Sequence, residues 1–189
     1  KHTIRFMVYF QNNGVEKFSM SKMAKDLEIS KTTIYNHFSS KEELLHSVIE
    51  IAAQELAGAL SEAPRSGARG FERIEDIVKA TFSLAARRPE VLGLVRLVSR
   101  QGGSGAAELA EAMNIMLSDA LRFMESEIEA GNFRRVEPRM LLLAIYSAVI
   151  GVATEPEVMR ALGLEPDVRS LVKARRETIL FLRAALVVN

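Results

Sequence analysis

The sequence predicts an all-α fold in which three short helices precede a larger helical body. In most segments apolar residues recur at spacings of three and four, as on one face of a helix, and no segment shows the sustained alternation that a half-buried strand requires. Glycine, proline and asparagine divide the chain into helix-sized pieces. A chain of 189 residues with 48% hydrophobic content is long enough to bury a core in one or two domains.

The first predicted helix runs from residue 3 to residue 12, and Gly14 follows it with C-cap chemistry. Residues 19–38 then read as a helix-turn-helix, two short helices joined by a turn at residues 28–30. Three helices of this length must share one small core. Its predicted members are Phe10, Phe18, Met23, Leu27, Ile34 and Phe38.

Serine residues mark the starts of the short helices. We expect Ser19 or Ser21 to cap the first helix of the pair and Ser30 to cap the second, each accepting a hydrogen bond from an unpaired backbone N–H. Ser39 and Ser40 each stand three residues before a glutamate. This capping-box spacing predicts a long helix from residue 41 to about residue 60.

Further helices fill the rest of the chain. Residues 64–70 are rich in turn formers, helical periodicity resumes from Phe71 to Ala85, and Pro89 suits the first turn of another helix. Glycines at residues 102–105 are expected to break that helix, and a long one should follow from about residue 106 to 130. The last predicted segments are a nearly wholly apolar helix opened by Pro138, a short piece over residues 155–162, and a final helix over residues 166–187.

The helix-turn-helix carries a pattern that extends beyond it. The run Ile29-Ser30-Lys31-Thr32-Thr33-Ile34-Tyr35-Asn36-His37-Phe38, followed by Ser40-Lys41-Glu42-Glu43-Leu44-Leu45, resembles the DNA-binding segment of TetR-family transcriptional regulators. Phe10, Gly14 and Phe18 extend the match. The resemblance implies a helix-turn-helix DNA-binding domain over residues 1–47 and a larger helical ligand-binding and dimerisation domain over residues 48–189.

The resemblance also implies which side chains contact double-stranded DNA. Lys31, Thr32, Thr33 and Asn36 fall where the family meets bases in the major groove, and Ser19, Ser21, Tyr35, His37 and Lys41 fall where it contacts phosphates. The family usually has glycine where Glu28 stands, and often a second glycine where Thr32 stands. Glu28 therefore needs a relaxed turn or a left-handed conformation, at a cost of about 1 kcal/mol. The alternative is a structural three-helix unit that serves protein contact.

A methionine-rich face on the helix over residues 106–130 admits two interpretations. The side chains can simply fill the core, or they can line a cavity for an apolar effector, because thioethers adapt to varied apolar ligands. By resemblance to the family, whose ligand cavity lies among the middle helices of the body, the candidate lining residues are Phe82, Leu92, Met113, Met116, Leu117, Met124 and Tyr146. The Tyr146 hydroxyl would orient the ligand.

The last two long helices suggest a homodimer. Residues 140–153 are apolar nearly all round, which means burial on more than one face. Small residues at Ala144, Ala148 and Gly151 would let a partner helix approach closely. Together with the final helix this segment could form half of a two-fold four-helix interface. The alternative is an ordinary buried helix in a monomer.

Several chemistries find no support in the sequence. It contains no cysteine, which excludes disulfides and cysteine-held metals and favours a reducing, cytoplasmic compartment. The three histidines lack metal-site spacing, and no acid, base or nucleophile set is evident, so we expect no enzyme, no metal and no cofactor. No apolar run is long enough for a membrane span, and no signal sequence opens the chain.

The combined reading is a ligand-responsive transcriptional repressor that binds a palindromic operator as a dimer and is released by a small apolar effector. A second hypothesis stays open at this point. The chain could be an all-α carrier or sensor of a lipid-like molecule whose helix-turn-helix serves protein contact.

Overall fold

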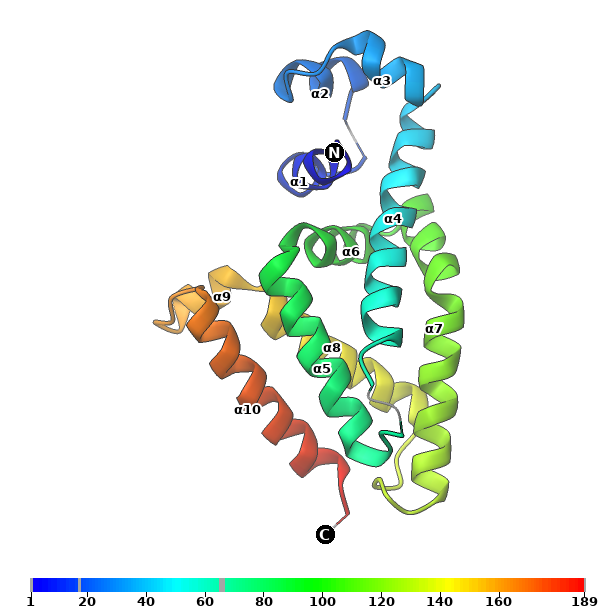
Figure 1. Ribbon diagram of the computed structural model, residues 1–189, viewed down its shortest axis with the longest axis vertical. Coiled ribbons are helices and arrows are strands. Elements are labelled where there is room, and N and C mark those ends of the chain that lie inside the picture. The colour runs from blue at the N-terminus through cyan, green and yellow to red at the C-terminus, as the bar shows by residue number, and fades with distance from the viewer. Residues whose placement is uncertain (1, 17, 65–66, 189) are drawn as a thin grey trace. The chain divides into compact units, whose positions relative to one another are not determined.

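The computed structural model describes residues 2–16, 18–64 and 67–188. Over these residues the protein is helical throughout, with no strand beyond one isolated bridge between Phe133 and Val187 (Figure 1). The helices are α1 (Thr3–Asn13), α2 (Met20–Asp26), α3 (Lys31–His37), α4 (Lys41–Ser61), α5 (Gly70–Arg87), α6 (Pro89–Gln101), α7 (Gly103–Glu129), α8 (Pro138–Thr154), α9 (Pro156–Ala161) and α10 (Val168–Leu186). The predicted all-α fold is confirmed.

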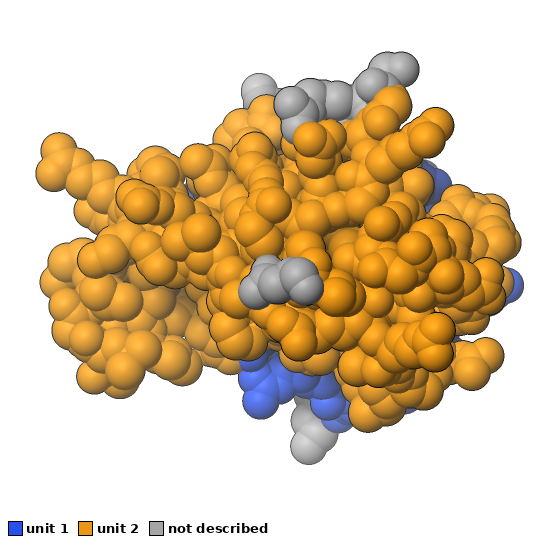
Figure 2. Space-filling model, turned by 90° about the horizontal axis from the view of Figure 1, so that it is seen from below, with its two compact units in different colours: residues 1–55, 90–113 blue, residues 56–89, 114–189 orange. Residues whose placement is uncertain are grey.

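Two compact units make up the chain, and Figure 2 colours them separately. Unit 1 comprises residues 1–55 and 90–113, and unit 2 comprises residues 56–89 and 114–189. Both boundaries fall inside helices, so α4 and α7 each contribute residues to both units. The division into residues 1–47 and 48–189 concerns function, and it stays a prediction.

Aromatic contacts hold the first helices of unit 1 together. The Phe10 and Phe18 rings meet edge to face with centroids 4.8 Å apart, and Phe6 meets Phe38 in the same way at 6.2 Å. Edge-to-face pairs add to the gain from burial because the positive edge of one ring meets the negative face of the other. Of the six predicted core residues, Phe10, Phe18, Met23 and Ile34 are buried, whereas Leu27 and Phe38 are half-buried.

The starts of α2 and α3 are capped differently. Ser19 caps α2 as predicted, since its side chain accepts a hydrogen bond from the Lys22 N–H at 3.4 Å. Ser30 occupies the N-cap position of α3, but its side chain accepts no such bond, so the predicted Ser30 cap is wrong in this respect. The Ser30 residue is exposed, and water can therefore solvate the first N–H groups of α3.

The start of α4 uses the predicted capping box. The Ser40 hydroxyl accepts a hydrogen bond from the Glu43 N–H at 3.1 Å, while the Glu43 carboxylate accepts from both the hydroxyl and the N–H of Ser39. The return bond thus reaches one residue further back than in the usual box. The Ser39 hydroxyl, followed by its N–H, holds the pKa of Glu43 below its ordinary value.

Other contacts in unit 1 join α1 to α6 and α4 to α7. The Gln11 side chain donates a hydrogen bond from Nε2 to the Glu90 carbonyl at 2.6 Å, and it crosses α6 so closely that a Cβ on Gly93 would lie 2.6 Å from the same Nε2 atom. His46 Nδ1 lies 3.2 Å from Glu108 Oε2. Side-chain contacts therefore fasten α6 and the start of α7 to the helices of the amino-terminal end.

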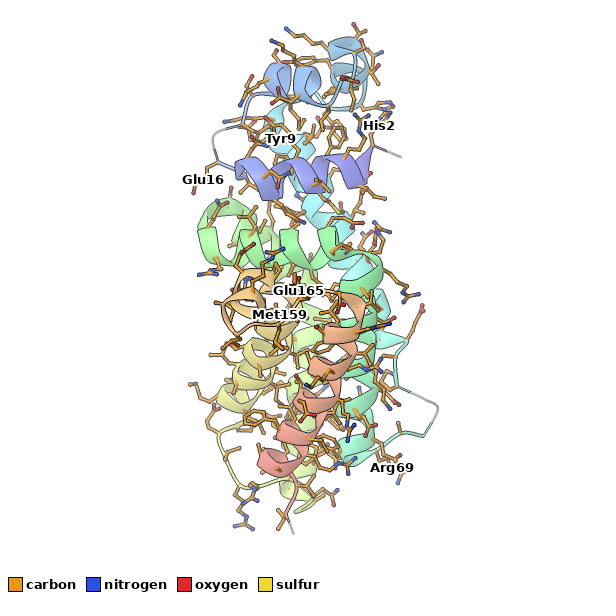
Figure 3. All side chains as sticks on the ribbon, turned by 90° about the vertical axis from the view of Figure 1, so that its left-hand side faces the viewer. His2, Tyr9, Glu16, Arg69, Met159 and Glu165 are labelled. Atoms are coloured by element: carbon orange, nitrogen blue, oxygen red, sulfur yellow. The ribbon has the colours of Figure 1, made fainter. Side chains whose placement is uncertain are left out.

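Unit 2 is organised around α5, α8 and α10, which pack against one another and lie side by side in Figures 1 and 3. The buried members of its core are Phe71, Ile74, Val78, Phe82, Met124, Phe133, Val149, Leu182 and Leu186. Arg183 of α10 reaches α5 twice, since Nη2 lies 3.0 Å from Glu75 Oε2 and the guanidinium lies 4.4 Å from the centroid of the Phe71 ring.

One predicted boundary is wrong. The glycines after α6 do not form a four-residue break, because α7 already begins at Gly103 instead of residue 106. Gly102 and Gly103 have φ values of 72° each, and these two residues alone make the turn. Arg65 and Ser66 of the predicted turn over residues 64–70 lie outside the described residues.

Candidate functional site

The short helix α3 turns one side chain inward and the others outward. Ile34 is 1% exposed and anchors the helix. Lys31, Thr32, Tyr35, Asn36 and His37 are exposed, and Thr33 is half-buried. The outward face therefore consists of hydrogen-bond donors without any acid, which is the composition suited to phosphates and base edges.

Three further predicted contact residues flank α3 in the sequence and in unit 1. Ser19 is exposed, Ser21 is half-buried, and Lys41 is exposed at the start of α4. The Lys41 ammonium lies 3.8 Å from Glu42 Oε1, and both side chains of this pair are exposed to solvent. Such a surface pair contributes roughly 0–1 kcal/mol, so it holds Lys41 only weakly and leaves it able to meet a phosphate.

The turn between α2 and α3 carries a strained residue. Glu28 has a φ of 52°, the only positive φ of a non-glycine residue among those described. Of the two conformations expected for this position, a relaxed turn or a left-handed one, the structure shows the left-handed one. The Glu28 side chain is exposed. Its conformation therefore serves to direct the chain from α2 into α3.

A cavity of about 330 Å³ lies within unit 2, among α5, α7 and α8 and next to the end of α4. Its lining is Leu60, Ser61, Arg73, Ile74, Ile77, Val78, Thr81, Met116, Leu117, Asp119, Ala120, Phe123, Met124, Leu142, Ile145, Tyr146, Val149 and Ile150. Most of these side chains are apolar. The volume lies at the small end of the range for ligand pockets.

The structure brings four of the seven predicted pocket residues to this cavity: Met116, Leu117, Met124 and Tyr146. The other three lie elsewhere. Phe82 is a buried member of the unit 2 core, and Leu92 and Met113 are buried in unit 1. None of these three side chains lines the cavity in this structure.

Apart from Tyr146, the sequence did not identify the polar residues of the lining, Arg73 and Asp119 above all. A signal for Arg73 was present, because Arg73, Ile77 and Thr81 recur at a spacing of four and so share one face of α5. A cation on an apolar face points to a partner or a ligand. Thr81 is buried, and its hydroxyl donates to the Ile77 carbonyl at 2.9 Å.

Two further features are absent from the residues that the structure describes. No group of three or more potential metal-ligating side chains gathers there. Within the same residues, no helix combines the length with the apolar character that crossing a bilayer demands.

Comparison with known families fits this geometry. The profile described as "Bacterial regulatory proteins, tetR family" matches residues 7–48, which hold the end of α1, all of α2 and α3, and the start of α4. Residues 7–48 are therefore a TetR-family segment. All nine predicted DNA-contact residues lie inside the matched segment.

Relatives with known names are similar to part of this chain. The nucleoid occlusion factor SlmA of Mannheimia succiniciproducens is 24% identical over 130 residues, which cover 69% of this chain and 56% of that protein. The fatty acid metabolism regulator protein of Bacillus subtilis is 25% identical over 119 residues, covering 63% of this chain and 60% of that protein. The chain thus spans about half the length of the curated relatives it matches first, 56% and 43% for SlmA proteins.

A solved structure shares the whole fold. A bacterial regulatory protein of the tetR family from Rhodococcus RHA1 superposes with a TM-score of 0.76 at 21% identity, over 99% of this chain and 97% of that one. At this identity the likeness concerns the fold alone.

Two helices of unit 2 expose apolar side chains. On α8 these are Met140 (63% exposed), Leu143 (55%) and Val152 (38%), and on α10 they are Val168 (65%), Val172 (48%), Leu180 (49%) and Phe181 (64%). A Cβ on Gly151 would meet nothing within 4 Å. These exposed apolar side chains lie on two helices that pack against each other.

Proposed function

We propose that the protein is a transcriptional regulator that binds a palindromic operator through α3 as a homodimer and responds to a small effector. The observation that carries the proposal is the outward face of α3, which presents donors, lacks acids and is held by the buried Ile34. A single two-turn helix makes too few contacts for selectivity. Two copies read two half-sites about one helical turn apart.

The homodimer would use the exposed apolar side chains of α8 and α10. Phe181→Glu places a charge on that surface and should convert a dimer to a monomer. Sedimentation equilibrium of wild type, Phe181→Glu and the control Lys79→Ala measures this directly. A wild type that stays monomeric at high concentration contradicts the dimer.

The cavity of unit 2 supports the response to an effector. Because α4 and α7 contribute residues to both units, we propose that an effector bound in unit 2 changes operator affinity through these continuous helices. A differential affinity of about 1–3 kcal/mol would change operator binding roughly 5- to 150-fold. The relative described as a fatty acid metabolism regulator supports an apolar effector, and we place the protein in the cytoplasm with the DNA.

A salt titration with duplex DNA tests the proposal. Lys41→Ala should weaken binding to all sequences and lower the slope of log affinity against log salt by about one, because one phosphate contact is lost. Thr33→Ala should instead change which base is preferred. Lys79→Ala removes the same charge from α5 and should leave both quantities unchanged.

Two results would contradict parts of the proposal. If Lys41→Ala altered base preference and left the salt slope intact, the assignment of phosphate and base contacts would be wrong. If the wild type bound no genomic fragment, including its own promoter region, the cavity would favour the second candidate, a carrier or sensor of a lipid-like molecule.

A further inference from the structure

The cavity of unit 2 is lined by one cation, Arg73, that forms no ion pair with a described residue. Arg73 is the only basic residue in its described lining, and its Nε atom is shielded from solvent with no hydrogen-bond partner among the described residues. Its guanidinium instead lies 4.6 Å from the centroid of the Phe123 ring. An arginine stays charged at any physiological pH and can only donate hydrogen bonds, so this side chain calls for an acceptor.

The acid in the lining does not supply that acceptor. The carboxylate of Asp119 is paired with Arg122, one turn further along α7. The Asp119 side chain is 50% exposed, so water solvates what Arg122 leaves unpaired. The positive charge of Arg73 is therefore the one that the described protein groups leave unbalanced at the cavity.

The remainder of the lining is suited to hydrocarbon. Ile77, Met116, Leu142 and Val149 are among its apolar members, and they come from three different helices. Apolar walls next to one forked donor favour a molecule with a tail and an anionic head.

We infer that the cavity takes an amphipathic carboxylate whose oxygens accept hydrogen bonds from Arg73 while its apolar tail lies against α5, α7 and α8. Planar guanidinium and carboxylate groups match in a two-bond geometry that neither an alcohol nor an amine can reproduce. The inference rests on the proposed function in one respect, since it names the chemical class of the effector.

Calorimetric titration of the whole chain with decanoate, decanol and decylamine tests the inference. The three probes share one tail and differ only in their head. We expect decanoate to bind the wild type roughly tenfold or more tightly than decanol, because a charge-assisted bidentate pair replaces a neutral hydrogen bond. Arg73→Met keeps the bulk of the side chain and removes its donors, so the two affinities should become similar.

Control variants show whether a change in decanoate affinity comes from loss of the Arg73 contact or from loss of the folded cavity. Arg87→Met removes an exposed arginine from the other end of α5 and should leave the preference for decanoate intact. Arg73→Lys keeps the charge without the fork, so a reduced preference should remain. Decanol binding by Arg73→Met reports that the cavity still forms.

Three results would overturn the inference: an unchanged decanoate preference in Arg73→Met, tighter binding of decylamine that Asp119→Asn abolishes, or no binding of any probe by the wild type. DNA binding is measured separately on the same samples. Decanoate binding that leaves operator affinity unchanged would support the inference and contradict the effector response. Operator release by other compounds, without decanoate binding, would contradict the inference and support the effector response.

Discussion

In the turn before α3, a glycine should be more stable than an alanine, which is the reverse of their order inside a regular helix. Glu28 has a φ of 52°, and a left-handed conformation costs a residue with a Cβ roughly 1–2 kcal/mol. Glycine does not bear this cost, but it lowers the free energy of unfolding by about 0.4–1 kcal/mol because it gives the unfolded chain more conformational freedom. Glu28→Gly should therefore be more stable than Glu28→Ala by about 0.5–1 kcal/mol. The side chain is exposed, so both variants lose the same solvent-facing groups.

The control is an exposed glutamate inside a regular helix. Glu111 lies within α7, where glycine should be less stable than alanine by about 1 kcal/mol. Urea denaturation of the four variants gives each free energy of unfolding, and about 1 kcal/mol corresponds to a shift of roughly 2–4 °C in Tm for a chain of this size. If glycine were the less stable residue at both positions, the strain assigned to Glu28 would be refuted.

Two further predictions concern unit 1. Gly93→Ala should push the Gln11 amide off the Glu90 carbonyl, since the new Cβ would lie 2.6 Å from Nε2. A double-mutant cycle with Gln11→Ala should then show a coupling of about 0.5–1.5 kcal/mol by denaturation, and a coupling of zero would contradict the contact. Glu43 has a lowered pKa, so its bonds to Ser39 stabilise the fold above the ordinary pKa of the carboxyl and are lost as pH falls through the lowered one. The stability difference between wild type and Glu43→Gln should therefore shrink on acidification, and a difference that stays constant with pH would count against it.

Local chemistry made the amino-terminal part predictable. The Ser19 cap, the glycine that ends α1 and the left-handed Glu28 all follow from what neighbouring residues require of the backbone. Helix positions along the rest of the chain followed from apolar spacing and from proline and glycine. The start of α7 could not be predicted in this way, because a run of glycines indicates that a helix breaks but not at which residue the next helix begins.

The cavity was only partly predictable. Spacing shows that Leu92 and Met113 face a core, yet it cannot show which of two compact units that core belongs to. Polar lining residues such as Arg73 were missed because a lone cation on an apolar face is usually read as a side chain that reaches water. Which helices enclose a cavity depends on tertiary packing, and spacing along one helix does not report it.

We propose that two copies of α3 read DNA. Selection of bound duplexes from a random library, using the whole chain at physiological salt, tests it most directly. The proposal predicts an enriched inverted repeat whose half-sites lie about one helical turn apart, with Thr33→Ala selecting a different half-site. Recovery of no enriched sequence, or of a single site without two-fold symmetry, would contradict it.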